Sequence, residues 1–326
     1  MDQIERQKSK ELSKIKINVI GIGKIGIGAI NRMILGNSHL ETEEFKLEYI
    51  AFSTNSQETL MSNAPKNILL AENFSQLSGS TEIIEEYFSI NEEDRKKINE
   101  IFKDAPHGLN IIVVALGSTI STNAALFVSN LAKKLGIFTI AFAIFPFYFE
   151  GMKRLTIAES GVKKLGNNFD SVAVVPCDKL KDLISEKNPK ISEMTDFVFE
   201  ILKRGVDCLL DIMMYSGLPC VDFQDVLKIL KGGGFAGIGV GRAQGEGRAT
   251  KATQEALKFP LLGGGLKEAK RIILNIPGDS NLRIDEIDMV CSQVQNAAND
   301  DVEIFFGSSP SIMDEGFLGV TIIAKK

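Results

Sequence analysis

The sequence predicts an α/β protein in which a first domain with a parallel sheet is followed by one long helix and a smaller α+β domain. Three observations predict this fold. Short apolar runs at 15–20 and 110–115 each precede a turn of small residues and a helical pattern, as in strand–helix–strand units. From 191 to about 214 the apolar residues recur at helical spacing. After residue 217, shorter strand and helix patterns alternate.

Length and composition exclude several classes of protein. The chain has 326 residues, 44% of them hydrophobic and 24% charged, which is typical of about two globular domains. The net charge of −5 and the lack of a basic stripe argue against nucleic acid as a partner. Four scattered cysteines and two histidines disfavour a zinc site, and they indicate reduced thiols in a cytoplasmic protein. The longest apolar run is too short to cross a bilayer.

The first predicted strand runs into a turn rich in glycine. The turn reads Gly21-Ile22-Gly23-Lys24-Ile25-Gly26-Ile27-Gly28, and a helical pattern follows it. Glycines at such a turn allow the backbone to approach a phosphate group closely. The same spacing also occurs where a helix and a strand merely pack closely together, so both interpretations stay open.

A second turn lies between the strand at 110–115 and a helix expected at 124–135. It contains Gly117, Ser118, Thr119, Ser121 and Thr122. A helix N-terminus at the end of a parallel strand offers free amides and a positive dipole end, and the hydroxyls add donors for phosphate. The alternative interpretation is an ordinary capped helix start without a ligand.

Other stretches refine these expectations. The strand at 47–52 ends in Ser53-Thr54-Asn55, where a dinucleotide-binding unit usually places an acid. This absence, together with the lack of a histidine suited to hydride transfer, disfavours an NAD-dependent oxidoreductase. The aromatic run at 145–149 is expected in the core. Glu150 and Arg154 are four residues apart, a spacing that also suits a surface ion pair.

Several segments, in this order, resemble FtsZ, the bacterial and archaeal relative of tubulin. They are INVIGIGKIGIGAINRMI, AFSTNSQETL, AALFVSNLAKKLG, FPFYFEGMKR, VVPCDKL, GLPCVDFQDV, GEGRA, FPLL, LNI and LRIDE, spread over residues 15–325. The resemblance implies a Rossmann-like GTPase domain, a long central helix and a second α/β domain. We therefore divide the chain into a solvated extension (1–14), a nucleotide-binding domain (15–190), the central helix (191–216) and a C-terminal domain (217–326).

The resemblance also implies roles for residues around a nucleotide. Gly21, Gly23 and Gly26 match the first phosphate loop, which Lys24 and Gly28 interrupt. In the second phosphate loop, Gly117 and Thr122 match, whereas Ser118, Thr119, Ile120, Ser121 and Asn123 depart from the alternation of glycine and threonine in the family. Side chains thus stand where bare backbone meets phosphate in the family.

Further matches concern the sugar and the base. Glu150 and Arg154 match the residues that contact ribose, and Glu200 stands where the family has an aspartate that binds guanine. The segment Ser78-Gly79-Ser80 is a reduced form of a third glycine loop, and Cys177 replaces an asparagine.

A loop that reaches the nucleotide of the next subunit is nearly complete. Asp222 and Asp225 match the two acids that position the attacking water, and Cys220 replaces an asparagine. The long helix, at about 1.5 Å per residue, spans roughly 36 Å, so we expect these acids to serve a neighbouring subunit and not their own nucleotide. Alternatively, they are a helix cap and a first-turn acid.

We therefore predict an FtsZ-like cytoskeletal protein of cell division that binds GTP and forms head-to-tail protofilaments. GTP is expected to be hydrolysed to GDP at subunit contacts, with Mg²⁺ as a candidate cation and other division proteins as candidate partners. Direct membrane contact is not expected, because no further segment follows the last predicted strand. The alternative is a degenerate paralogue that binds nucleotide weakly or not at all and supports another filament protein. An oxidoreductase is a distant third.

Overall fold

The structure is a computed structural model that describes residues 14–37, 42–70, 92–103, 108–184, 189–214, 222–263, 265–309 and 314–326, apart from the side chains of residues 37, 182 and 309. The chain divides into two units, Met1–Val172 and Ala173–Lys326. The predicted segments at 1–13, 78–80 and 215–221, Cys220 included, lie outside the described residues. No described helix is long and apolar enough to cross a membrane.

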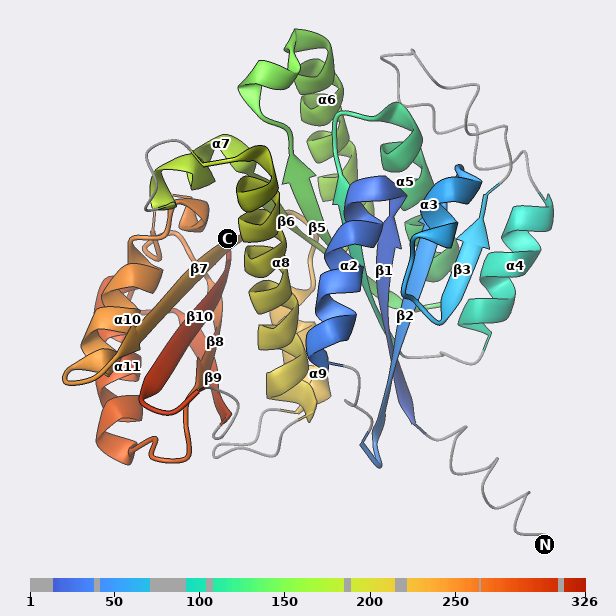
Figure 1. The fold of residues 1–326 in the computed structure, drawn as a ribbon. Coiled ribbons are helices and arrows are strands. Elements are labelled where there is room, and N and C mark those ends of the chain that lie inside the picture. The colour runs from blue at the N-terminus through green and yellow to red at the C-terminus, as the bar shows by residue number, and fades with distance from the viewer. Residues whose placement is uncertain are drawn as a thin grey trace, which may run out of the picture. The chain divides into compact units, whose positions relative to one another are not determined.

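The first unit is a parallel α/β sheet with helices packed on it (Figure 1). The strand order is β3-β2-β1-β4-β5, and the division between the two units falls inside the next strand, β6. Its elements are β1 (Ile15–Ile22), α2 (Gly23–Asn37), β2 (Phe45–Ser53), α3 (Ser56–Leu60), β3 (Lys66–Leu69), α4 (Glu92–Phe102), β4 (Leu109–Ala115), α5 (Thr119–Lys134), β5 (Phe138–Phe145), η3 (Tyr148–Glu150) and α6 (Met152–Asn168). β6 (Ser171–Pro176) begins in this unit and ends in the second.

The central strands of this unit are apolar because helices cover them. Nearly every residue of β1 and β4 is buried, which is typical of parallel strands shielded on both faces. An exception to their apolar character is Asn18, whose amide donates to Asn110 Oδ1 over 2.8 Å. These two residues are register partners on β1 and β4, so the pair satisfies part of its own hydrogen-bonding need inside the core.

The second unit contains one long helix and a mixed sheet. Its strand order is β7-β10-β8-β9; β10 is antiparallel to both β7 and β8, and β8 is parallel to β9. Its elements are α7 (Cys177–Leu180), η4 (Lys181–Leu183), α8 (Ile191–Met214), α9 (Phe223–Leu230), β7 (Phe235–Gln244), α10 (Arg248–Leu257), η5 (Pro260–Leu262), β8 (Arg271–Pro277), α11 (Ile284–Ala297), β9 (Glu303–Ser309) and β10 (Phe317–Lys325).

The predicted central helix is confirmed as α8, one uninterrupted helix of 24 residues. Within the second unit it packs against β8, β9 and β10. Its residues are largely buried from Ile201 onward, whereas Ile191 at its start is exposed. The apolar stripe in the sequence therefore corresponds to a real packing surface along most of the helix.

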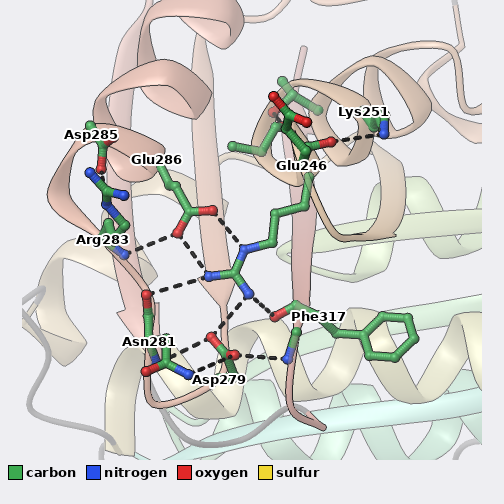
Figure 2. Close-up of polar contacts among 12 residues, drawn as sticks. Glu246, Lys251, Asp279, Asn281, Arg283, Asp285, Glu286 and Phe317 are labelled. Atoms are coloured by element: carbon green, nitrogen blue, oxygen red, sulfur yellow. Dashed lines mark hydrogen bonds and ion pairs between the residues drawn. The ribbon is translucent and has the colours of Figure 1, made fainter.

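A buried arginine joins three segments of the second unit. Arg248, the first residue of α10, donates to both carboxylate oxygens of Glu286 over 2.6 and 2.8 Å and to Asp279 Oδ1 over 3.0 Å (Figure 2). It also donates to the carbonyl of Phe317 over 3.3 Å. Asp279 in turn accepts the backbone N–H of Gly316 over 2.8 Å. One side chain thus holds the start of α10, the β8–α11 turn and the start of β10 together.

Candidate functional site

The glycine-rich run after β1 is not a turn, contrary to prediction. β1 continues to Ile22 and α2 begins at Gly23, so most of the run lies inside the helix. Gly23 has φ +68°, a conformation that side chains disfavour, and this single residue lets the strand pass directly into the helix.

Gly21 and Gly26 allow α2 to lie close to the sheet. A Cβ at Gly26 would lie 2.4 Å from the carbonyl oxygen of Val113 on β4, and one at Gly21 would lie 2.5 Å from the carbonyl oxygen of Gly26. Neither distance is tolerable for a carbon atom. Both glycines are therefore required for close helix–strand packing, which was one of the two interpretations of their spacing.

We expect Gly26→Ala to lower the free energy of unfolding by about 1–3 kcal/mol, because the added methyl must displace α2 from β4. Urea denaturation followed by circular dichroism measures this difference. A loss below about 0.5 kcal/mol, the range of neutral surface substitutions, would show that α2 can shift without cost.

The second predicted turn is mostly helix. α5 begins at Thr119, whereas the prediction placed its start near Ala124. Ser118 is the N-cap, with its hydroxyl accepting the N–H of Ser121 over 3.4 Å. Its carbonyl accepts the hydroxyl of Thr122 over 2.9 Å. The serine and threonine side chains satisfy the first turn of the helix locally, so the polar segment folds as a helix start.

The two helix starts meet at a cavity of about 330 Å³ in the first unit. A Cβ at Gly23 would lie 2.8 Å from Ser121 Oγ, so the two segments are in direct contact. The cavity is lined by Ile22, Gly23, Lys24, Ile25, Ser53, Thr54, Asn55, Glu58, Leu70, Ala115, Ser118, Ile120, Ser121, Ala124 and Arg154. Its walls therefore come from the carboxyl ends of neighbouring parallel strands and from the helices that follow them, the usual place for a ligand in such a sheet.

Only some of the predicted site residues line this cavity. Those that do are Gly23, Lys24, Ser118, Ser121 and Arg154. Those that do not, among the residues predicted in the first unit, are Gly21, Gly26, Gly28, Gly117, Thr119, Thr122 and Glu150. Gly117 has φ +90° and lies against Arg154, so it shapes the entry to α5 without facing the cavity.

The charges around the cavity favour an anion. Lys24 and Arg154 line it, and the first turns of α2 and α5 contain no acid that would oppose their positive dipole ends. Glu58 is the single carboxylate among the described lining residues, and it accepts the hydroxyl of Ser53 over 2.6 Å. The sequence interpretation missed Glu58, because it looked for an acid at the end of β2 itself. The acid comes instead from α3, three residues beyond Asn55, which caps that helix.

Glu150 and Arg154 form the ion pair that their spacing predicted. Arg154 Nη1 lies 2.7 Å from Glu150 Oε2, and Glu150 also accepts the backbone N–H of Phe147 over 2.9 Å. The expectation that the neighbouring aromatics belong to the core is wrong for two of them: Tyr148 is 70% exposed and Phe149 65% exposed. Both lie in η3, beyond the last residue of β5, so the sheet does not cover them.

The remaining predicted residues belong to the second unit. Asp222 is the N-cap of α9 and accepts the N–H of Gln224 over 3.3 Å, while Asp225 pairs with Lys228 over 2.9 Å. Glu200 pairs with Arg204 over 3.1 Å and lines a different cavity within that unit. The helix-cap interpretation of Asp222 and Asp225 thus describes their local geometry, which leaves both carboxylates at the surface or near it.

A divalent cation fits this site only together with a phosphate ligand. The described residues contain no cluster of three histidine, cysteine, aspartate or glutamate side chains. Mg²⁺ in phosphate sites is commonly held by one or two carboxylates plus phosphate oxygens and water. Glu58 is suited to be such a carboxylate, because it lines the cavity beside Lys24.

Comparison with known proteins identifies the family. Residues 16–185 match the model of the GTPase domain of the tubulin/FtsZ family, and residues 234–326 match that of the C-terminal domain of the FtsZ family. The chain belongs to the tubulin/FtsZ family. The predicted resemblance and the predicted fold class are therefore confirmed.

Solved structures of the tubulin/FtsZ family have the same fold. An empty FtsZ dimer from M. jannaschii is 26% identical, with a TM-score of 0.84 over 100% of this chain and 93% of that chain. A point mutant of FtsZ from M. jannaschii is 25% identical, with a TM-score of 0.85 over 99% of this chain and 94% of that chain. CetZ2 from Haloferax volcanii, in a GTPγS-bound protofilament, is 18% identical, with a TM-score of 0.75 over 95% of this chain and 93% of that chain.

Proposed function

We propose that this FtsZ-like chain binds GTP in the cavity between α2 and α5 and assembles head to tail into protofilaments. The observation that carries the proposal is one cavity in the part of the chain that matches the GTPase domain of the family. The first turns of α2 and α5 meet at this cavity without an acidic residue, and Lys24 and Arg154 line it. The proposal also includes hydrolysis of GTP to GDP at subunit contacts, a role in cell division together with other division proteins, and a cytoplasmic location. The M. jannaschii FtsZ dimer and the CetZ2 protofilament support self-assembly.

The chain's own residues have distinct roles in this proposal. Lys24 supplies a point charge for phosphate where the family has bare glycine, and Arg154, oriented by Glu150, contacts the ribose side. The N–H groups at the start of α5 add donors. When bound, Mg²⁺ would neutralise phosphate charge, with Glu58 as the carboxylate on the protein side. The assignment of Glu200 to guanine stays a prediction.

A second candidate function, a structural partner that binds nucleotide weakly or not at all, rests on the second phosphate segment. Ser118 uses its hydroxyl to cap α5, and Ile120 lines the cavity with an apolar side chain. Each misplaced side chain near a phosphate costs about 1–3 kcal/mol in binding. The two candidates differ in whether GTP is bound at all.

We expect GTP to bind with a Kd weaker than about 1 μM, because side chains replace the bare backbone of the phosphate loops. Calorimetry with GTP, GDP and ATP on nucleotide-free protein measures the affinity and the preference for guanine. Submicromolar binding of GTP would contradict the expected weakening. Absence of any GTP binding at millimolar concentration would overturn the proposed function in favour of the structural partner.

A further inference from the structure

A second cavity, of about 240 Å³, lies within the second unit between α8 and the sheet. It is lined by Glu200, Lys203, Arg204, Asp207, Cys208, Asp211, Gly241, Arg242, Asn275, Pro277, Asp314, Gly319 and Thr321. Seven of these side chains are acidic or basic, four acids and three bases. Charged side chains that are partly removed from water are stable only when a partner balances each charge.

Each of the three basic side chains forms an ion pair with one of the four acids. The pairs are Glu200 with Arg204, Asp207 with Lys203, and Asp314 with Arg242. The carboxylate left over is Asp211, for which no cationic partner exists among the described residues. Only 7% of its surface is exposed, and its Oδ2 accepts the side-chain amide of Asn275 on β8 over 2.8 Å.

The surroundings of Asp211 oppose its negative charge. Burial, and next the charge of Asp207 one turn earlier on α8, raise its pKa to about 7; Asn275 and Lys203 counteract them in part. The unfolded carboxyl ionises near its ordinary pKa of 3.8, so as the pH rises from there to about 7 the unfolded state loses its proton first. The contribution of Asp211 to stability therefore falls over this range and is constant above it.

The other described elements around Asp211 offer it no compensating charge. β7 contributes Arg242 to the cavity, which is paired with Asp314 before β10; β8 contributes Asn275 and β10 contributes Thr321. Charged groups on β9 and α9, which also pack against α8, have partners elsewhere: Glu303 pairs with Arg271, and Lys228 with Asp225.

We propose that Asp211 is a proton-sensitive contact that controls how firmly α8 is held on the sheet of the second unit. Below neutral pH the carboxyl is neutral, and its hydrogen bond with Asn275 joins α8 to β8 at no electrostatic cost. Above neutral pH the carboxylate is charged and unpaired, so it must take up water in the cavity, which favours opening of the contact between α8 and β8. This device depends on the second unit alone, and it holds whether or not the chain hydrolyses GTP.

Cys208 provides a direct probe of this opening. Cys208 is among the residues around the same cavity but is only 1% exposed, so a neutral maleimide reaches its thiol only when α8 moves away from the sheet. Labelling is followed by mass spectrometry of the peptide that contains Cys208, at pH 6 and pH 8.5. Dividing each rate by the rate for urea-unfolded protein at the same pH removes the intrinsic chemistry of the thiol.

In the wild type we expect the normalised rate to rise about tenfold between these pH values, because the effect changes over about one pH unit, from pH 6 to the pKa of about 7, and is constant above it. In Asp211→Asn, which keeps the shape and removes the charge, it should stay constant. Asp285→Asn is the control, because Asp285 is an exposed carboxylate of the same unit that pairs with Arg283 outside the cavity, and it should behave as the wild type. A wild-type rise that persists in Asp211→Asn, or no rise in the wild type, would overturn the proposal.

Asp207→Asn provides a test that does not require Asp211→Asn to fold. Because the charge of Asp207 raises the pKa of Asp211, removing it should move the midpoint of the Cys208 labelling profile to lower pH. An unchanged midpoint would count against Asp211 as the titrating group.

Discussion

Replacing Arg248 by methionine is expected to lower the free energy of unfolding of the second unit by about 3–5 kcal/mol. This is the range for removing one partner of a buried ion pair, because the remaining charges stay buried without compensation. The side chain of Arg248 is 9% exposed and that of Asp279 4% exposed, so water reaches neither freely. Methionine retains most of the side-chain volume, so the loss reports the missing charge and hydrogen bonds and not a cavity.

The effect should extend beyond the ion pair. Asp279 also accepts the N–H of Gly316, and Glu286 also accepts the N–H of Arg283 at the start of α11. Without Arg248, two carboxylates are left facing each other, and both the β8–α11 turn and the start of β10 lose a common anchor. We therefore expect increased hydrogen exchange at Gly316 and Phe317 as well as lower stability.

Two variants make the measurement specific. Arg248→Lys keeps the positive charge but cannot form the forked pair with Glu286, so an intermediate loss is expected. Arg283→Ala removes an exposed arginine that pairs with Asp285, and it should change stability by less than about 0.5 kcal/mol. Urea unfolding at pH 7 measures all three. If Arg248→Met and Arg283→Ala lose the same amount, the buried network has no special role.

The same network predicts a response to acid. The hydrogen bond from the guanidinium of Arg248 lowers the pKa of Glu286, and the hydrogen bond from the Gly316 N–H, followed by Arg248, lowers that of Asp279. Because both pKa values are lower in the folded state, the stabilisation is present above the ordinary carboxyl pKa values and is lost as the pH falls below about 4. Arg248→Met should show a weaker dependence on pH in this acid range.

Replacing Asp225 by asparagine is expected to lower GTP turnover by about 100-fold or more in assembled protein, if the carboxylate positions the attacking water. The cavity proposed for GTP is lined by residues of the first unit, whereas Asp222 and Asp225 belong to the second. Nucleotide binding by the monomer should therefore be nearly unchanged. Wild-type phosphate release should be negligible at low protein concentration and rise once subunits associate head to tail.

The structure suggests how to separate catalysis from helix capping. Asp222 caps α9, so Asp222→Ser keeps a side-chain acceptor for the N–H of Gln224 but removes the carboxylate. Glu193 is a matched control for Asp225, because it is a first-turn acid of α8 that pairs with the lysine three residues earlier. We expect Asp222→Ser to lose turnover and Glu193→Gln to keep it. Normal turnover in Asp222→Ser and Asp225→Asn would leave both acids as elements of helix structure only.

The sequence by itself determined most of the strands and the long helix, together with the burial of their apolar residues. The apolar runs at 15–20 and 110–115 became β1 and β4, and the periodic stripe became α8 almost to the residue. The helix that follows Asp222 was also predicted with its cap. These features depend on local periodicity and on the shielding of apolar side chains from water, and both can be recognised from the order of neighbouring residues in the sequence.

Only the tertiary structure decided which of the candidate residues meet. Gly21 and Gly26 had the spacing of a phosphate loop, yet a Cβ at Gly26 would meet the carbonyl of Val113, 87 residues further along, and one at Gly21 would meet the carbonyl of Gly26, so both are needed for packing. Glu58 entered the first cavity because β2 lies beside β1 in the sheet. Asp211 is left without an ion pair because the bases near it, on α8 and β7, pair with acids on α8 and in the segment before β10. Each depends on distances between segments remote in sequence, which the packing of the whole chain sets.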